Sequence, residues 1–266
     1  MGRITESFKK LRQNREKALV GFVTAGDPDF ETSKKIILSM CYAGMDILEL
    51  GIPFSDPSAD GPVIQRSSMR ALKKGMTMAN AFDMVREIRK HHSIPIVLFS
   101  YYNPVLAYGA EKFQKDAMDA GADGVLIVDL PPEESSELTS QWDGREFPLI
   151  RLIAPTTGPD RAKMIASGAE GFIYLISKTG VTGSGGLDTS KTGEYAEMVR
   201  KLTDMPLCTG FGISKPEDAK ALAAYGDGIV IGSAFEKAIE ENIGNAGIAD
   251  KLAGMVRSFK EAIKIK

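Results

Sequence analysis

Residues 43–51 read Ala-Gly-Met-Asp-Ile-Leu-Glu-Leu-Gly, a glycine that can end a helix followed by a short apolar run. Related patterns return at 120–125, 167–172 and 225–229, each with a glycine just before an apolar run. Glycine suits a helix end because it adopts the left-handed backbone conformation at little cost. The pattern therefore predicts that helices and strands alternate along this chain.

Eight apolar runs divide the chain, and most are rich in Val, Ile, Leu and Phe without strict polar alternation. Such runs are typical of strands buried on both faces of a sheet. One-sided apolar stripes with helical spacing lie between them, for example at 32–42, 79–90 and 215–225. The runs are 18–24, 46–51, 95–101, 124–130, 148–154, 171–177, 206–212 and 228–232.

Alternating strands and helices predict parallel strands with right-handed crossovers. We therefore expect residues 1–266 to form a single (β/α)8 barrel domain, the α/β class also called a TIM barrel. The second and third runs start 49 residues apart, at 46 and 95, so an insertion should follow the second strand. A milder insertion should follow the sixth. An open, doubly wound sheet is the alternative, but no G-x-G-x-x-G turn follows the first run.

An extra N-terminal helix is predicted before the first strand, because Ile4, Phe8 and Leu11 share one face. We expect this helix to plug the bottom of the barrel.

Composition narrows the function classes. The chain has 266 residues, with 33 Lys and Arg against 35 Asp and Glu, and no basic run that would attract nucleic acid. No stretch is apolar enough to span a membrane, and the N-terminus lacks an apolar signal core. Cys41 and Cys208 lie in apolar segments and are expected to be buried, reduced thiols. These features predict a cytoplasmic enzyme or binding protein with neither a nucleic-acid nor a membrane partner.

The two histidines, His91 and His92, are neighbours at the end of a predicted helix before the third strand. That position lies opposite the face where barrel active sites form. We therefore expect no histidine-based metal site and no metal, and acid–base chemistry must come from carboxylates, Tyr or Lys.

Glu49 is the first candidate catalytic residue. Side chains alternate along a strand, so Glu49 points to the barrel interior if Leu48 and Leu50 face the helices. Burial of a carboxylate there would raise its pKa toward neutrality. The alternative is a glutamate that only bonds neighbouring backbone.

Asp60 is the second candidate, in the proline-rich loop 52–62 that follows. It could reach back toward Glu49, and two carboxylates in different surroundings can divide general acid and base roles. An Asp-Gly pair also forms simple turns, which is the alternative for Asp60.

The last three predicted strands end in glycine-rich loops. Glycine lets backbone N–H groups approach an anion, helix N-termini favour negative charge, and barrels commonly bind phosphate after strands 7 and 8. We therefore expect a phosphorylated substrate, although tight turns could explain any one glycine. The expected phosphate donors are Gly183, Gly212, Gly232 and Ser233.

The segment 179–186, which includes Gly180 and Thr182, is predicted to be a mobile lid. An apolar wall at the strand ends would suit a flat aromatic substrate. Its expected members are Phe22, Phe99, Leu126, Tyr174 and Phe211.

Lys178 supports a different mechanism, because it follows the sixth strand with the same parity as Tyr174. A desolvated lysine there could form a Schiff base with a carbonyl, as in a class of aldolases. A non-catalytic barrel that only activates a partner enzyme is a further alternative.

Residues 48–62, LELGIPFSDPSADGP, closely resemble the signature of the tryptophan synthase α subunit family. The segments 22–28, 174–177, 180–183 and 210–214 match the same family in order, so the resemblance covers nearly the whole chain. It implies a lyase that cleaves indole-3-glycerol phosphate to indole and glyceraldehyde 3-phosphate in tryptophan biosynthesis. A stand-alone lyase of the same family is the alternative.

The resemblance also implies residue roles. Glu49 and Asp60 correspond to the family's catalytic carboxylates, and Tyr174 lines the site. The chain itself would need no cofactor. Two departures are Lys178, where the family more often has arginine, and a short, glycine-rich 184–188 stretch.

The resemblance further implies a partner, a pyridoxal-phosphate β subunit in an α2β2 heterotetramer, with a tunnel that retains indole. The docking face implied for it comprises Pro53, Asp56, Pro57, Asn103 and Pro132.

Overall fold

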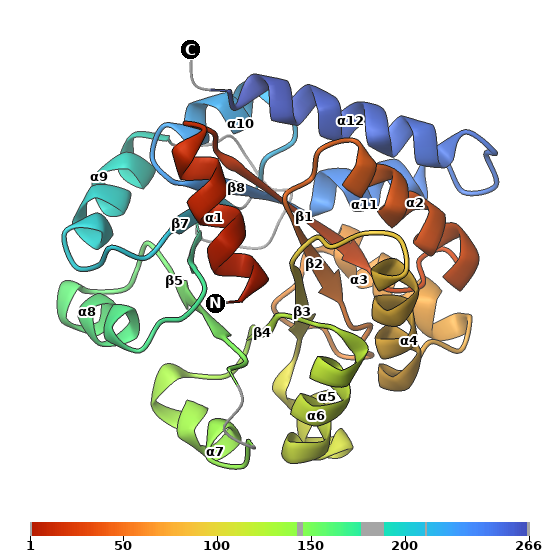
Figure 1. Ribbon diagram of the computed structural model, residues 1–266, viewed down its shortest axis with the longest axis horizontal. Coiled ribbons are helices and arrows are strands. Elements are labelled where there is room, and N and C mark those ends of the chain that lie inside the picture. Colours follow the sequence, from red (N-terminus) through yellow and green to blue (C-terminus); the bar gives the residue numbers. More distant parts are fainter. Residues whose placement is uncertain (1, 143–145, 177–188, 211, 265–266) are drawn as a thin grey trace.

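A closed barrel of parallel strands forms the centre of the molecule (Figure 1). The computed structural model describes residues 2–142, 146–176, 189–210 and 212–264. The strands follow one another around the barrel in chain order, and β1 pairs with β8 to close it. This closure confirms the predicted barrel and excludes the open doubly wound sheet. The strands are β1 (Ala18–Thr24), β2 (Ile47–Gly51), β3 (Ile96–Ser100), β4 (Gly124–Ile127), β5 (Leu149–Ile153), β6 (Ile173–Ile176), β7 (Leu207–Gly210) and β8 (Gly228–Ile231).

Helices surround the barrel and connect successive strands (Figure 1). The predicted insertion after β2 is the helix α3, which precedes the crossover helix α4. Part of the milder insertion predicted after β6 falls on 177–188, outside the described residues. The helices are α1 (Arg3–Gln13), α2 (Phe30–Tyr42), α3 (Pro62–Lys73), α4 (Met78–Arg89), α5 (Tyr102–Tyr108), α6 (Ala110–Ala120), the 3-10 helix η1 (Pro132–Glu134), α7 (Ser135–Thr139), α8 (Pro159–Ser167), α9 (Thr189–Arg200), α10 (Pro216–Ala223), α11 (Ser233–Glu240) and α12 (Ile248–Ala262).

Strand side chains divide between two cores. Leu48 and Leu50 belong to the outer core between strands and helices. The inner core fills the barrel with residues of the opposite parity, such as Val20, Ile47 and Val97. Glu49 shares the parity of Ile47, so the sequence places it inside the barrel.

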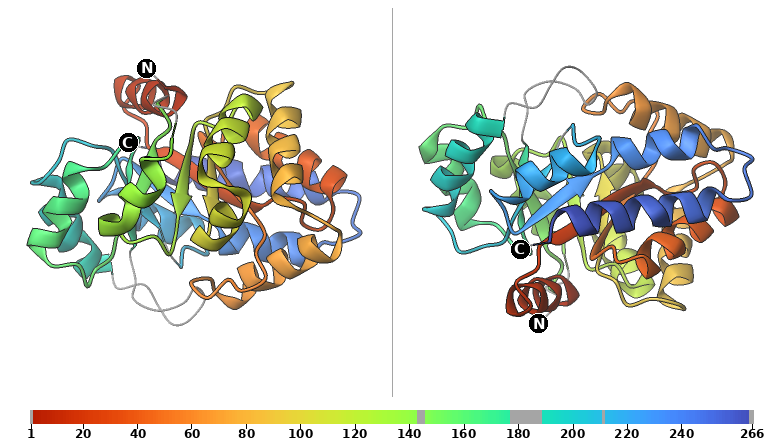
Figure 2. Two further views of the ribbon diagram at one scale, coloured as in Figure 1. Left: turned by 90° about the horizontal axis from the view of Figure 1, so that it is seen from below. Right: turned by 90° about the horizontal axis from the view of Figure 1, so that it is seen from above.

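The helix α1 closes one end of the barrel. Its buried residues Ile4, Phe8 and Leu11 join the inner core, and Phe8 packs on Phe172 with ring centroids 5.8 Å apart. Figure 2 shows α1 at this end and α3 at the other. The predicted plug is confirmed, and α3 therefore marks the end where the strands finish.

The glycines that precede alternate strands differ in backbone conformation. Gly44 and Gly121 have φ values of 106° and 104°, as expected for left-handed helix ends. The same expectation is wrong for Gly168, whose φ is −104°, and for Gly226, which does not have a positive φ. Gly226 is instead needed for close approach, because a Cβ there would lie 2.7 Å from the Leu207 carbonyl oxygen.

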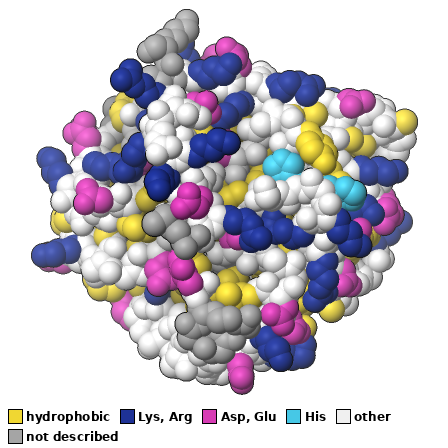
Figure 3. All heavy atoms as spheres, in the orientation of Figure 1, with side chains coloured by type: hydrophobic (Ala, Val, Ile, Leu, Met, Phe, Trp, Pro, Cys, Tyr) yellow, Lys and Arg dark blue, Asp and Glu magenta, His cyan; other side chains and the backbone are white. Residues whose placement is uncertain are grey.

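The remaining composition-based expectations concern cysteine and histidine. Cys41 and Cys208 are both buried and free. The histidines follow α4 on the face that carries α1, where cationic and anionic side chains are interspersed (Figure 3). The His92 Nδ1 atom accepts a hydrogen bond from the Ile94 N–H, a local structural contact. No described helix is long and apolar enough to cross a membrane.

Candidate active site

A pocket at the carboxyl ends of the strands brings together both candidate carboxylates. It is open on one side, and its inner volume is about 60 Å³. The described residues that line it are Phe22, Glu49, Asp60, Ile64, Phe99, Tyr174, Gly212, Ile213, Val230, Gly232 and Ser233.

Glu49 supplies the deepest charged group of this pocket. Its side chain is only 1% exposed, and its Oε1 atom has no hydrogen-bond partner among the described residues. Burial raises the pKa of Glu49 from 4.5 to about 8. The group is therefore largely protonated at neutral pH, as a proton donor needs to be.

Asp60 approaches from the loop between β2 and α3. Burial raises its pKa to about 6, while a hydrogen bond from Tyr101 acts in the opposite direction. The donor is the Tyr101 hydroxyl, 2.9 Å from Asp60 Oδ2. Asp60 is therefore largely ionised at neutral pH, when Glu49 is largely protonated. The two carboxyl groups can accordingly act as acid and hydrogen-bond acceptor in one site.

Tyr174, on β6, lies beside these carboxyl groups. Burial raises its pKa well above 10, and the nearby Glu49 charge adds to the shift. The phenol thus stays neutral. Gly210 on β7 makes room for it, since a Cβ there would lie 2.6 Å from the Tyr174 hydroxyl oxygen.

The backbone around β7 and β8 forms the other end of the pocket. Gly212 has a φ of 73° and open space where a Cβ would be, and Gly232 is the N-cap of α11. Ser233 begins that helix. The first N–H groups of a helix have no partner within it and favour an anion. This end of the pocket therefore suits a phosphate.

Two phenylalanine rings form the apolar side. Phe22 and Phe99 meet edge to face with centroids 5.2 Å apart. Phe22 also lies under Gly51, where a Cβ would come within 2.6 Å of its ring. Leu126 is in the inner core but does not line the pocket, so it lies deeper than predicted.

Several predicted residues fall outside the described part of the chain. They are Lys178, Gly180, Thr182, Gly183 and Phe211.

Sequence reasoning missed Tyr101, Ile64, Ile213 and Val230. Val230 belongs to the inner core, and strand parity could have identified it. Tyr101 has the parity of Phe99, two residues further along the chain, and this signal could have identified it. Ile64 and Ile213 lie beyond strand ends, where strand parity no longer applies.

The predicted docking face is only partly accessible. Asp56 and Asn103 are exposed and Pro132 is half-buried, whereas Pro53 and Pro57 are buried within the chain. These two prolines are therefore not accessible for docking in this structure.

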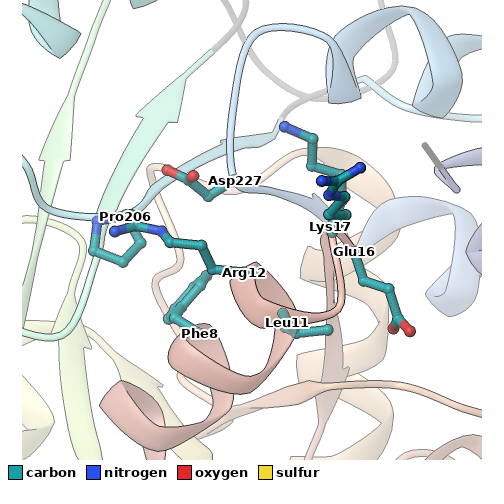
Figure 4. A pocket seen from close by; sticks show the side chains of 8 residues that line it. Phe8, Leu11, Arg12, Glu16, Lys17, Pro206 and Asp227 are labelled. Carbon is teal, nitrogen blue, oxygen red and sulfur yellow. The ribbon is translucent and has the colours of Figure 1, made fainter.

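A larger hollow, of about 270 Å³, lies beside α1 at the opposite end of the barrel (Figure 4). Phe8, Leu11 and Pro206 form its apolar side. Its acidic residue Asp227 pairs with Arg200 and accepts the Leu207 N–H at 2.9 Å, so it has a structural role. Within the described ranges, no group of three His, Cys, Asp or Glu residues could hold a metal ion.

Comparisons with known proteins identify the family of this chain. A family model described as "Tryptophan synthase alpha chain" matches residues 8–264. The tryptophan synthase alpha chain of Desulfatibacillum aliphaticivorans is 60% identical over 264 residues, covering 99% of this chain and 98% of that protein. The relative of the same name from Geobacter sulfurreducens is 46% identical over 99% of both chains.

Solved structures extend the similarity to the fold. Tryptophan synthase subunit alpha from Legionella pneumophila has a TM-score of 0.90 and 36% identity, covering 99% of this chain and 98% of that one. A Mycobacterium tuberculosis tryptophan synthase structure has a TM-score of 0.91 and 29% identity, covering 100% and 99%.

Proposed function

This chain belongs to the tryptophan synthase alpha chain family, and we propose that Glu49 and Asp60 carry out its reaction. The protein is a lyase that cleaves indole-3-glycerol phosphate to indole and glyceraldehyde 3-phosphate. The observation that carries the proposed roles is that both carboxyl groups line one buried pocket, with pKa values of about 8 and about 6.

Glu49 is the proposed general acid and base. The bond between indole C3 and the glycerol chain can break only after C3 gains a proton, because the ring must accept the bonding electrons. Protonated Glu49 delivers that proton and becomes a carboxylate. The carboxylate then removes the proton of the side-chain hydroxyl, the carbon–carbon bond breaks, and indole and an aldehyde form while Glu49 regains its proton.

Asp60 is the proposed acceptor of a hydrogen bond from the indole N–H. Protonation of C3 places positive charge on the ring nitrogen, and an ionised carboxylate stabilises that charge more in the transition state than in the substrate. The Tyr101 hydrogen bond supports this role because it favours ionised Asp60. Tyr174 would exclude water from the space beside Glu49.

The remaining residues bind and orient the substrate. Gly212, Gly232 and Ser233 would hold the phosphate with backbone N–H groups, together with Gly183. The rings of Phe22 and Phe99 would pack on the indole. Gly180 and Thr182 remain the proposed lid residues, and Phe211 a proposed member of the apolar wall. Leu126 would support this wall from the inner core beneath it.

The alpha chain is the subunit of tryptophan synthase that pairs with a beta subunit. We propose an α2β2 heterotetramer in the cytoplasm. The alpha chain would be one barrel domain that needs no cofactor, and pyridoxal phosphate would reside in the beta subunit. The proposed docking residues are the exposed Asp56 and Asn103 and the half-buried Pro132.

Indole release by the purified chain tests the assignment. We expect Glu49→Gln to abolish turnover and Asp60→Asn to reduce kcat by about a hundredfold, the usual size of an electrostatic or acid–base contribution. Glu197→Gln, which removes an exposed carboxylate on α9, should leave activity unchanged. Full activity in both active-site variants would refute the mechanism.

A further inference from the structure

Glu236 is a buried acidic residue that the proposed mechanism does not use. It lies on α11, three residues after Ser233, and its side chain is 0% exposed. Its Oε1 atom accepts the Thr24 N–H at 2.6 Å. Its Oε2 atom is also buried, and no hydrogen-bond donor among the described residues reaches it, while the Asp27 carboxyl group lies beside the Glu236 side chain.

The neighbouring carboxyl group, Asp27, is already fully engaged. Asp27 is 0% exposed, and Arg70 of α3 donates to both of its oxygens, at 2.8 and 2.7 Å. Arg70 also pairs with Glu240 at 2.7 Å, and Arg66 donates to both oxygens of Glu240. These four groups are therefore two cations and two anions that balance one another.

Glu236 would upset this balance if it were ionised. A carboxylate at this position would add one buried negative charge without a cation of its own, which is strongly unfavourable. A proton on Oε2 removes the charge and supplies the donor that the contact with Asp27 lacks. The pKa of Glu236 agrees in direction, because burial, the charge of Asp27 and a hydrogen bond between the two carboxyl groups all raise it.

The contact between Glu236 and Asp27 links the phosphate end of the pocket to the end that carries Asp60. Glu236 lies in the first turn of α11, whose start lines the phosphate end. Asp27 is bound through Arg70 to α3, which begins two residues after Asp60. A hydrogen bond of 2.7 Å between Thr24 Oγ1 and Ser67 Oγ also ties β1 to α3.

We propose that Glu236 is a neutral carboxylic acid whose hydrogen bond to Asp27 positions the phosphate-binding start of α11 relative to the Asp60 loop. It is a positioning residue, and this role rests on the proposed function of the pocket. Its neutral state does not depend on that function.

Infrared spectroscopy tests the neutral state directly. The difference spectrum between the wild-type chain and Glu236→Gln at pH 7 should show the loss of one protonated carboxyl C=O band. Loss of carboxylate bands instead would overturn the proposal, whether or not the chain cleaves its substrate.

Kinetics test the positioning role. Glu236→Gln keeps an acceptor for Thr24 and a donor for Asp27, so its KM for indole-3-glycerol phosphate should stay within about twofold of wild type. Glu236→Met removes both hydrogen bonds and should raise KM by about tenfold, the effect of one lost hydrogen bond to a charged group. Its kcat should change less than its KM. Glu241→Gln, at the exposed end of the same helix, is the matched control.

Two kinetic results would overturn the positioning role. One is an unchanged KM in Glu236→Met. The other is an equal loss in the Gln and Met variants, which would show that the negative charge matters. An inactive wild-type chain would instead refute the proposed function, and the infrared result would still decide the protonation of Glu236.

Discussion

The Tyr101 hydroxyl donates a hydrogen bond of 2.9 Å to Asp60 Oδ2 across two loops that follow different strands. The same hydroxyl oxygen accepts the Ala59 N–H at 3.0 Å. Tyr101 thus holds the loop and the carboxylate together. Because its bond to Asp60 opposes the effect of burial, it keeps the pKa of Asp60 near 6.

Tyr101→Phe should therefore move the acidic limb of the pH–rate profile to higher pH. Without the donor, burial alone acts on Asp60, and its pKa rises above about 6. Activity that needs ionised Asp60 is then lost at a higher pH. At pH 6 we expect kcat/KM to fall by about tenfold, in line with loss of a hydrogen bond to a charged group.

The measurement is kcat/KM from pH 5 to 9. Tyr42→Phe is a suitable control, because the Tyr42 side chain is exposed and its hydroxyl bonds only the His91 carbonyl among the described contacts. An unchanged acidic limb in Tyr101→Phe would show that Asp60 ionisation does not control the rate.

Glu49 should make the stability of the protein decrease as pH rises. In the unfolded chain the group loses its proton near pH 4.5, whereas in the folded chain it holds the proton to about pH 8. Between these values the unfolded state binds fewer protons, so the free energy of unfolding falls with increasing pH. Burial of Glu49 thus opposes folding at neutral pH.

Glu49→Gln should remove this penalty. Relative to wild type, the variant should gain about 4 kcal/mol of unfolding free energy between pH 4.5 and pH 8. Urea unfolding of both proteins at several pH values measures the difference. If the unfolding free energies of the two proteins changed in parallel with pH, the raised pKa of Glu49 would be contradicted.

Strand parity made Glu49 predictable from the sequence. A one-residue change of register would move its side chain to the helix face, and Leu48 and Leu50 exclude that register because they belong in the outer core. The apolar runs likewise located each strand. They overestimated β4, which ends at Ile127 rather than residue 130, because apolar loop residues extend the run.

Residues beyond the strand ends could not be predicted in the same way. The sequence names Asp60 as a candidate, and strand parity extends to Tyr101. Their hydrogen bond, however, forms because two loops fold over the barrel mouth, and no periodic pattern records that geometry. Glu236 appears in the sequence as an ordinary helical glutamate, and only packing against Asp27 reveals its environment. The burial of Pro53 and Pro57 could not be predicted for the same reason, since loop conformation decides their exposure.

Asp123 should be important for stability at the end of the barrel that α1 closes. Its Oδ2 atom accepts the Ile96 N–H at 2.8 Å and pairs with Arg89 at 2.6 Å, while Oδ1 pairs with Arg3 of α1. Asp123→Ala leaves a buried N–H and a largely buried guanidinium without this partner. We expect a loss of about 3 kcal/mol in unfolding free energy.

Denaturant unfolding and hydrogen exchange in α1 measure this effect. The matched control is Asp83→Ala, which removes only an exposed pair with Arg86 and should change stability little. Equal effects of the two substitutions would show that Asp123 is not a structural anchor.

Gly210 should be essential for the shape of the active site. A Cβ at this position would lie 2.6 Å from the Tyr174 hydroxyl oxygen and 2.7 Å from the Val230 Cβ, and both neighbours line the pocket. Neither can move without disturbing the barrel interior, so Gly210→Ala should cost about 1–3 kcal/mol of stability. Because Tyr174 would shift beside Glu49, kcat should also fall.

Gly168→Ala is the matched control for this substitution. Gly168 has a φ of −104°, and nothing lies within 4 Å of the position its Cβ would take. Its substitution should leave both indole release and unfolding free energy essentially unchanged. If Gly210→Ala also left activity and stability unchanged, the prediction would be wrong. Only free space beside the Tyr174 hydroxyl could accept the added methyl group, and the packing of β6, β7 and β8 leaves none.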